Sequence, residues 1–292
     1  MNNQGTHKKE GRKHTYSFPS ISAYAAFVQE IENSGKYWPK SKRSSHIHRG
    51  DYWASCDFDQ ALDRALDGGY WPEGAEQLQS INLAGQAGEL IEQLNDELIL
   101  APVGGAVDIG EYLADGEECF YLMDSVEQAQ TIVKIAVMNV CSSDTKASQV
   151  MNRGRAIMAL VDALESRNFS VQLDVVDSFK WKKAVFPEYR TTIKQAGEPW
   201  AAGTVAYPLA NASWGRRLGF RAAEGSPCGS MTTKGYGDGD DLAMWQSETI
   251  NSGDYDFAFG YMLGESIFNT PNGALRSVIS TANKQNPQLL AA

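Results

Sequence analysis

Three short segments of the chain interleave aromatic side chains with lysine or arginine. They are residues 37–43 (YWPKSKR), 179–183 (FKWKK) and 214–217 (WGRR). Single-stranded nucleic acid is bound by this combination, because cations match the phosphates while aromatic faces stack the bases at about 1–3 kcal/mol each. Lysines and aromatics also flank ordinary strands, so a solvated surface is the alternative for each segment. The side chains expected to contact nucleic acid are Trp38, Lys42, Arg43, Lys180, Trp181, Lys182, Lys183, Trp214, Arg216 and Arg217.

Charge is spread unevenly along the chain. Residues 1–49 contain nine Lys or Arg and three acids, whereas all 292 residues together carry a formal net charge of −10. The acidic remainder argues against wrapping duplex DNA over a broad surface, because it repels phosphates. Residues 1–15 are charged and lack an apolar core. They predict a disordered basic arm, which is either a nucleic-acid contact or a solvated tail.

A second candidate site is the loop at residues 139–145 (NVCSSDT), which lies between an apolar run and a helical pattern. The apolar run over residues 132–140 is typical of a strand covered on both faces. Open α/β sheets bind ligands at the carboxyl ends of such strands. We therefore expect the loop to bind a protein partner through its amide and hydroxyl groups. The residues are Asn139, Ser142, Ser143 and Thr145.

This strand, loop and helix resemble the metal-dependent adhesion site of von Willebrand factor A domains, which place Asp-x-Ser-x-Ser here. Asn139 stands where the aspartate is expected, Cys141 at the first serine and Ser143 at the second. Because the aspartate offsets part of the cation's charge, its loss implies a degenerate core without a metal. An ordinary strand-to-helix turn is the alternative.

Residues 131–180 predict a strand, a helix and a second strand. Apolar residues at 157, 160, 161 and 164 follow the spacing of one helix face, and Asn168 ends that helix. Val171, Leu173 and Val175 then alternate with Gln172 and Asp174, as in a half-buried strand. This crossover unit predicts an α/β fold, Rossmann-like or von Willebrand A-like, with a mixed sheet and flanking helices. We expect one principal domain over residues 16–292 with this unit at its core.

Local signals predict further elements around this unit. Asp57 is expected to cap a helix together with Gln60. Residues 188–195 predict a strand, residues 201–209 a short helix, and a helix capped by Asn211 is expected to end at residues 218–220. Thr270 and Pro271 begin a final helix.

The residue types that support common catalytic mechanisms are sparse. All four histidines lie within the first 48 residues, and the chain has no phosphate-binding loop, dinucleotide fingerprint or GxSxG motif. His46 and His48 alone do not make a metal site, and the acidic turn at residues 235–241 lacks the calcium-loop pattern. No run of eighteen apolar residues predicts a membrane span, and the four cysteines have no CxxC spacing, as in a reduced cytosolic protein. We expect a protein that is not an enzyme and needs no cofactor; the fallback is metal-dependent chemistry at Asp238, Asp240 and Asp241.

Three segments, taken in order, resemble an uncharacterised family of tailed-bacteriophage proteins. They are residues 49–78, 152–173 and 206–220; the first contains Trp53 and a Gly-Tyr-Trp-Pro-Glu-Gly turn at residues 69–74. Tyr70 adds a residue to the family's tighter form of this turn. The resemblance implies a phage origin and action in the host cytoplasm, and it implies no catalytic residues. The sequence therefore favours a non-enzymatic phage accessory protein that contacts single-stranded nucleic acid or its machinery. A protein-binding module on a degenerate von Willebrand A-like core, and a virion structural component, are the alternatives.

Overall fold

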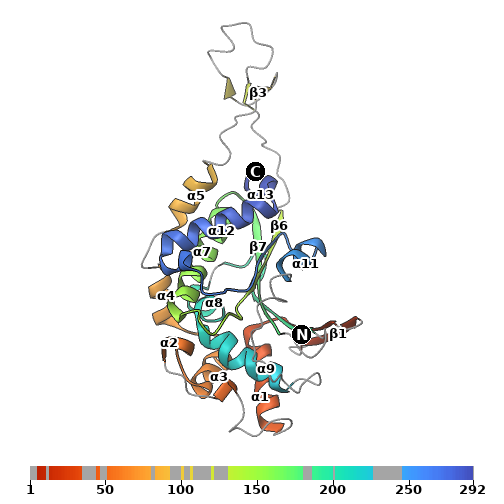
Figure 1. Cartoon of the computed structure of the whole chain (residues 1–292). Helices are drawn as coiled ribbons and strands as arrows, with labels where there is room; N and C mark the ends of the chain where they lie inside the picture. Colours follow the sequence, from red (N-terminus) through yellow and green to blue (C-terminus); the bar gives the residue numbers. More distant parts are fainter. Residues whose placement is uncertain are drawn as a thin grey trace.

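The computed structural model of the chain is built on a mixed six-stranded sheet, in the order β1-β2-β8-β7-β6-β9 (Figure 1). The strands are β1 (Thr6–Glu10), β2 (Lys13–Phe18), β6 (Ile132–Met138), β7 (Ser170–Ser178), β8 (Phe186–Lys194) and β9 (Phe257–Phe259). The structure describes residues 5–10, 13–34, 44–46, 51–79, 83–92, 100–101, 106–107, 120–121, 131–179, 186–199, 201–225 and 245–291. A second, three-stranded sheet contains β3 (Leu100–Ala101), β5 (Phe120–Tyr121) and β4 (Ala106–Val107).

The predicted crossover unit is confirmed. Strand β6 pairs with β7 in parallel, from Ile132 opposite Ser170 to Met138 opposite Val176. The helix between them, α7 (Ala147–Glu165), contributes the predicted apolar face to the core. Asn168 adopts a positive φ of 67°, the left-handed conformation that ends the helix.

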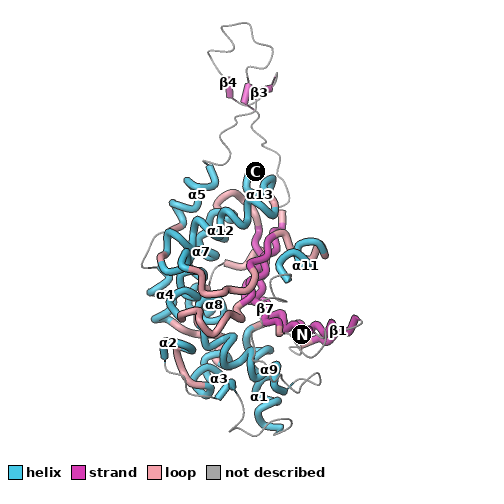
Figure 2. Tube along the Cα trace, viewed as in Figure 1, coloured by secondary structure: helices cyan, strands magenta, loops and turns pink. Residues whose placement is uncertain are grey.

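Helices flank the sheet, so the predicted α/β architecture with a mixed sheet is confirmed. Helices α7, α8 and α12 lie on one side of the sheet and α11 on the other (Figure 2). The longer helices are α1 (Ile21–Ser34), α3 (Phe58–Leu66), α4 (Pro72–Gln79), α5 (Ala84–Glu92), α8 (Ala202–Ala210), α11 (Trp245–Asn251) and α12 (Pro271–Gln285). Shorter helical segments are η2 (Ser44–His46), α2 (Asp51–Ala54), η3 (Trp214–Gly219), α9 (Phe220–Gly225), η4 (Ser266–Asn269) and α13 (Pro287–Ala291).

Capping predicted from sequence is confirmed at two helices. The Asp57 carboxylate accepts from the backbone N–H of Gln60 over 2.8 Å at the start of α3. The Thr270 hydroxyl accepts from the Gly273 N–H over 3.1 Å, and Pro271 follows it as the first residue of α12. Both caps satisfy helix N–H groups that lack an intrahelical partner.

Two predictions about the ends of elements are wrong. The segment after Asn211 does not stop at Gly219, because the π-helical η3 continues directly into α9. Gly219 serves packing instead: a Cβ at this position would lie 3.1 Å from Cγ of Asp177. The basic arm expected to be disordered over residues 1–15 contains β1 and the start of β2, which extend the sheet as a hairpin.

Candidate functional site

The Trp-Gly-Arg-Arg segment lies inside the protein rather than on its surface. Trp214 has an exposed fraction of 0%, Arg216 of 1% and Arg217 of 2%. The Trp214 ring packs against Tyr24 and Tyr207, with ring centroids 4.9 and 5.9 Å away. These three residues therefore cannot form the nucleic-acid-binding patch expected from sequence.

The two buried arginines hold distant loops together. Nη2 of Arg216 donates to the carbonyl oxygens of Ser142 and Thr145, each over 2.7 Å, and Nη1 donates to that of Trp53. Arg217 donates to the carbonyl oxygens of Cys56 and Ser45 over 2.9 and 3.1 Å. Backbone carbonyls thus compensate part of the cost of burying each guanidinium, because a buried donor without an acceptor is costly.

The loop at residues 139–145 is closed by the same contacts. Asn139 and Thr145 are buried. The Asn139 amide donates to the Pro208 and Asn211 carbonyls, and the Thr145 hydroxyl donates to that of Met262 over 3.2 Å. Asn139 and Thr145 therefore cannot meet a partner as expected from sequence. Ser142, half-buried, and Ser143, exposed, are the expected partner-binding residues that reach the surface.

Arg216 also bears on the resemblance to metal-dependent adhesion sites. Its guanidinium binds two carbonyls of the loop in which such a site would place a cation. A fixed positive charge at this point opposes cation binding by Coulomb repulsion. Among the described residues, no group of three or more His, Cys, Asp or Glu is arranged to hold a metal ion.

The remaining expected nucleic-acid contacts, Trp38, Lys42, Arg43, Lys180, Trp181, Lys182 and Lys183, lie outside the described residues. Their described neighbours meet at α9. Phe179, directly before Lys180, packs against Phe220 at the start of this helix, with ring centroids 6.0 Å apart. At the other end of α9, Glu224 accepts from the hydroxyl and the N–H of Ser45 over 2.7 and 3.3 Å. Phe179 and Ser45, which are close to these segments in the sequence, therefore both contact one short helix.

The basic hairpin pairs with β8, the strand that follows one of these segments in the sequence. Strand β2 pairs with β8 in parallel, and Lys13 lies opposite Phe186, the first residue of β8. The hairpin sequence over residues 6–14 (THKKEGRKH) contains four Lys or Arg, two His and one Glu. All five residues of β1 are exposed. The register thus brings exposed cations to the end of the sheet where β8 begins.

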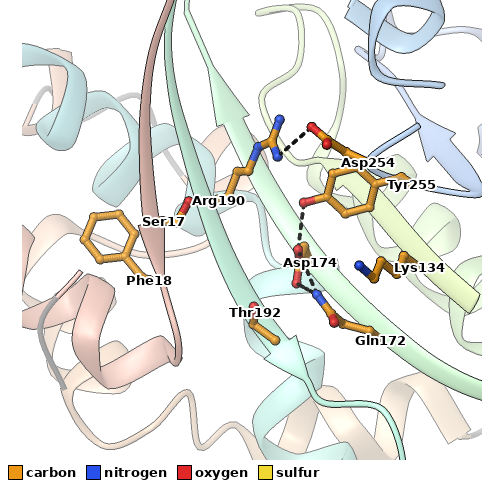
Figure 3. Close-up of a pocket in the computed structure, with 9 residues that line it drawn as sticks. All are labelled: Ser17, Phe18, Lys134, Gln172, Asp174, Arg190, Thr192, Asp254 and Tyr255. Carbon is orange, nitrogen blue, oxygen red and sulfur yellow. Dashed lines mark hydrogen bonds and ion pairs between the residues drawn. The ribbon is translucent and has the colours of Figure 1, made fainter. Parts of the chain in front are cut away.

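A polar pocket on the sheet was not predicted from sequence (Figure 3). It has a volume of about 220 Å³ and is lined by Ser17, Phe18, Lys134, Gln172, Asp174, Arg190, Thr192, Asp254 and Tyr255. Strand register assembles it, since Lys134 lies opposite Gln172, Asp174 opposite Thr192, and Arg190 opposite Ser17. Phe18 points away from the group, whereas the polar side chains gather over β7 and β8 (Figure 3). The sequence signal that could have indicated this pocket is the alternation of Gln172 and Asp174 with apolar residues, which places both polar side chains on one face of β7.

Arg190 is held firmly at one wall of this pocket. It pairs with Glu188 and, over 3.2 Å, with Asp254, and it stacks on the Tyr255 ring at 5.4 Å. Burial alone would lower the pKa of Arg190, but Glu188 raises that pKa above its ordinary value. Burial, with Asp174 nearby, raises the pKa of Tyr255, so its hydroxyl stays protonated and can donate. The wall therefore has a fixed arrangement of charges.

Asp177 is a buried carboxyl on the helix-covered side of β7. The Tyr24 hydroxyl donates to its Oδ2 over 3.4 Å, and Gly219 packs directly against it. Burial raises the pKa of Asp177 to about 7, although its contacts with Tyr24 and Trp214 oppose the shift. The group is enclosed in the core, so it bears on stability rather than on ligand binding.

Two further observations concern the cysteine thiols and membrane-spanning helices. Cys56 and Cys141 are buried thiols not joined in a disulfide, and burial raises the pKa of each. A raised pKa leaves less of the reactive thiolate, which argues against nucleophilic roles. In the described part of the chain, no helix has the length and apolarity needed to cross a bilayer.

One family model matches most of the chain. It is the domain of unknown function DUF7192, and the match covers residues 4–266. No curated protein and no solved structure matches the chain.

Proposed function

Since the chain belongs to the DUF7192 family, a domain of unknown function, its own residues must suggest a role, and we propose that it is a non-enzymatic protein that contacts single-stranded nucleic acid. The contact surface is the end of the sheet where β8 begins. The observation that carries the proposal is the β2–β8 register, which places the basic hairpin at the start of β8, the strand that follows the lysine- and tryptophan-containing residues 180–183 in the sequence.

The hairpin offers exposed cations that can bind the phosphates of a single-stranded nucleic acid. Lys8 and Lys9 lie on the exposed strand β1, and Lys8 pairs with Glu10 over 2.6 Å at the surface. Such an exposed pair is weak and exchanges readily for another anion. His7 stacks on Tyr16 with ring centroids 4.3 Å apart, so an aromatic face accompanies the cations. Cations beside aromatic rings are the combination that binds single strands without sequence preference.

The resemblance to tailed-bacteriophage proteins supports an infected cell as the setting of this activity. We assign the protein the role of a phage accessory factor that acts on nucleic acid inside the infected cell. The alternative of a protein-binding module on the 139–145 loop has less support, because Asn139 and Thr145 are buried. A virion component would instead be found in purified particles by mass spectrometry.

The test is fluorescence anisotropy of a labelled single-stranded oligonucleotide, titrated with the full chain at several salt concentrations. We expect binding at about 50 mM salt, with an affinity that falls as salt rises because counterions are released. Lys8→Ala with Lys9→Ala, and separately Trp181→Ala with Lys182→Ala and Lys183→Ala, should each weaken binding. Each set should also reduce the slope against salt by about 1 or more.

The matched control removes two exposed cations elsewhere. Arg276 and Lys284 lie on α12, and both are exposed. Arg276→Ala with Lys284→Ala should leave the affinity nearly unchanged. Absence of binding at about 50 mM salt, or equal losses in the control and in both test variants, would refute the proposal.

A further inference from the structure

Asp174 is a nearly buried carboxylate without a cationic partner among the described residues. Its exposed fraction is 6%. Its hydrogen bonds come from neutral donors: the Tyr255 hydroxyl over 2.7 Å and the Gln172 amide over 3.3 Å. Arg190, the nearby guanidinium, is paired with Glu188 and Asp254 instead. A nearly buried carboxylate whose hydrogen bonds all come from neutral donors favours a positively charged ligand.

Lys134 faces Asp174 from the neighbouring strand. Figure 3 shows the ammonium end of Lys134 turned toward Asp174, and no hydrogen bond joins them. The two positions are diagonal neighbours, since Lys134 lies opposite Gln172 and Asp174 lies two residues further along β7. Both side chains line the same pocket, so a small molecule bound there can contact the two charges.

The pocket offers further hydrogen-bonding groups. Thr192 lies opposite Asp174 on β8, and Ser17 lies opposite Arg190 on β2. Both line the pocket, and their hydroxyls bond to no other described side chain. A hydroxyl can donate or accept, so these groups can orient a polar ligand of either kind.

We propose that this pocket binds a free α-amino acid, with the ligand's ammonium group on Asp174 and its carboxylate on Lys134. A carboxylate and an ammonium that line the same pocket match the two ends of such a zwitterion. The volume of about 220 Å³ accommodates a molecule of this size. The Tyr255 ring, stacked with Arg190, forms the wall that the ligand's side chain contacts.

The first measurement is a thermal melt of the full chain with each of the twenty amino acids at 10 mM. A ligand bound by the native state raises the melting temperature, and we expect a rise of about 2 °C or more with at least one amino acid. Isothermal calorimetry then gives the affinity for that amino acid. Asp174→Asn and Lys134→Met should each weaken binding at least about tenfold, because each removes one charge that the ligand pairs with.

The decarboxylated amine of the same amino acid tests the two contacts separately, because it keeps the ammonium group that pairs with Asp174 and lacks the carboxylate that pairs with Lys134. Its binding should weaken with Asp174→Asn and be unaffected by Lys134→Met. Lys146→Met, at an exposed position before α7, is the control and should leave all affinities unchanged. The proposal is wrong if no amino acid shifts the melting temperature, or if Asp174→Asn binds as tightly as the wild type. Thr192→Val, which removes a hydroxyl from the pocket without altering charge, provides a second test should Asp174→Asn unfold.

Discussion

The hydroxyl of Tyr255 donates to Oδ2 of Asp174 over 2.7 Å, although the two residues are 81 positions apart in the chain. This hydrogen bond ties the turn before β9 to the middle of β7. The Arg190 guanidinium lies over the Tyr255 ring, with its Cζ 5.4 Å from the ring centroid. The geometry of the polar pocket therefore depends on a contact between two distant segments.

Removal of this hydroxyl should be measurable. Tyr255→Phe keeps the ring against Arg190 but leaves the Asp174 carboxylate with the Gln172 amide as donor. Loss of a buried hydrogen bond to a charged acceptor should lower the free energy of unfolding by about 1–3 kcal/mol. Urea denaturation measures the change. Tyr70→Phe, at a tyrosine that is 56% exposed, is the control and should have almost no effect.

Asp177 should make stability depend on pH. Its pKa in the folded protein is about 7, raised from an ordinary value of 3.8 by burial. The folded state therefore holds the proton more tightly than the unfolded state, and this contribution is full below about pH 4 and lost as pH rises toward 7. Asp177→Asn mimics the protonated form. Relative to wild type, the variant should gain on the order of 2 kcal/mol between pH 5 and pH 8, measured by urea denaturation at both values. Parallel pH profiles for the two proteins would contradict this assignment.

Gly219 should not tolerate a side chain. An added Cβ would lie 3.1 Å from Cγ of Asp177 and 3.2 Å from the Phe179 ring, so Gly219→Ala requires these buried neighbours to move by a few tenths of an ångström. We expect a loss of about 1–3 kcal/mol in the free energy of unfolding. Gly85→Ala is the matched control, because no atom lies within 4 Å of its added Cβ on α5. That change should stabilise the protein by about 0.5–1 kcal/mol through helix propensity. Equal changes in the free energy of unfolding for Gly219→Ala and Gly85→Ala would argue against close packing at Gly219.

Arg216 should be essential for the fold. Arg216→Met leaves the carbonyls of Ser142, Thr145 and Trp53 without their donor, and we expect a loss of about 3 kcal/mol or more. Arg216→Lys should not restore stability, because an ammonium cannot reproduce the planar set of donors. Thermal and chemical unfolding measure both. A variant with unchanged stability but weaker nucleic-acid binding would instead mean that Arg216 reaches the surface.

The β6–α7–β7 unit could be predicted from sequence because its signals are local. The apolar run, the helical spacing and the alternation after Asn168 each arise within one element. The burial of Arg216 and Arg217 could not be predicted in this way, because it depends on carbonyls contributed by residues 45–56 and 142–145. An arginine beside a tryptophan has the same composition on a surface and in a core. The polar pocket was missed for a similar reason, since its lining comes from four strands and the turn at Asp254 and Tyr255.

The pairing of β2 with β8 also constrains how the protein forms during synthesis. Lys13 is synthesised 173 residues before its partner Phe186 (186 − 13). Until then, the hairpin has an unpaired strand edge that can pair with other chains. Its lysines discourage such association, because like charges on neighbouring nascent chains repel. The basic residues of the hairpin therefore disfavour association of the unpaired β2 edge with other chains until β8 has been synthesised.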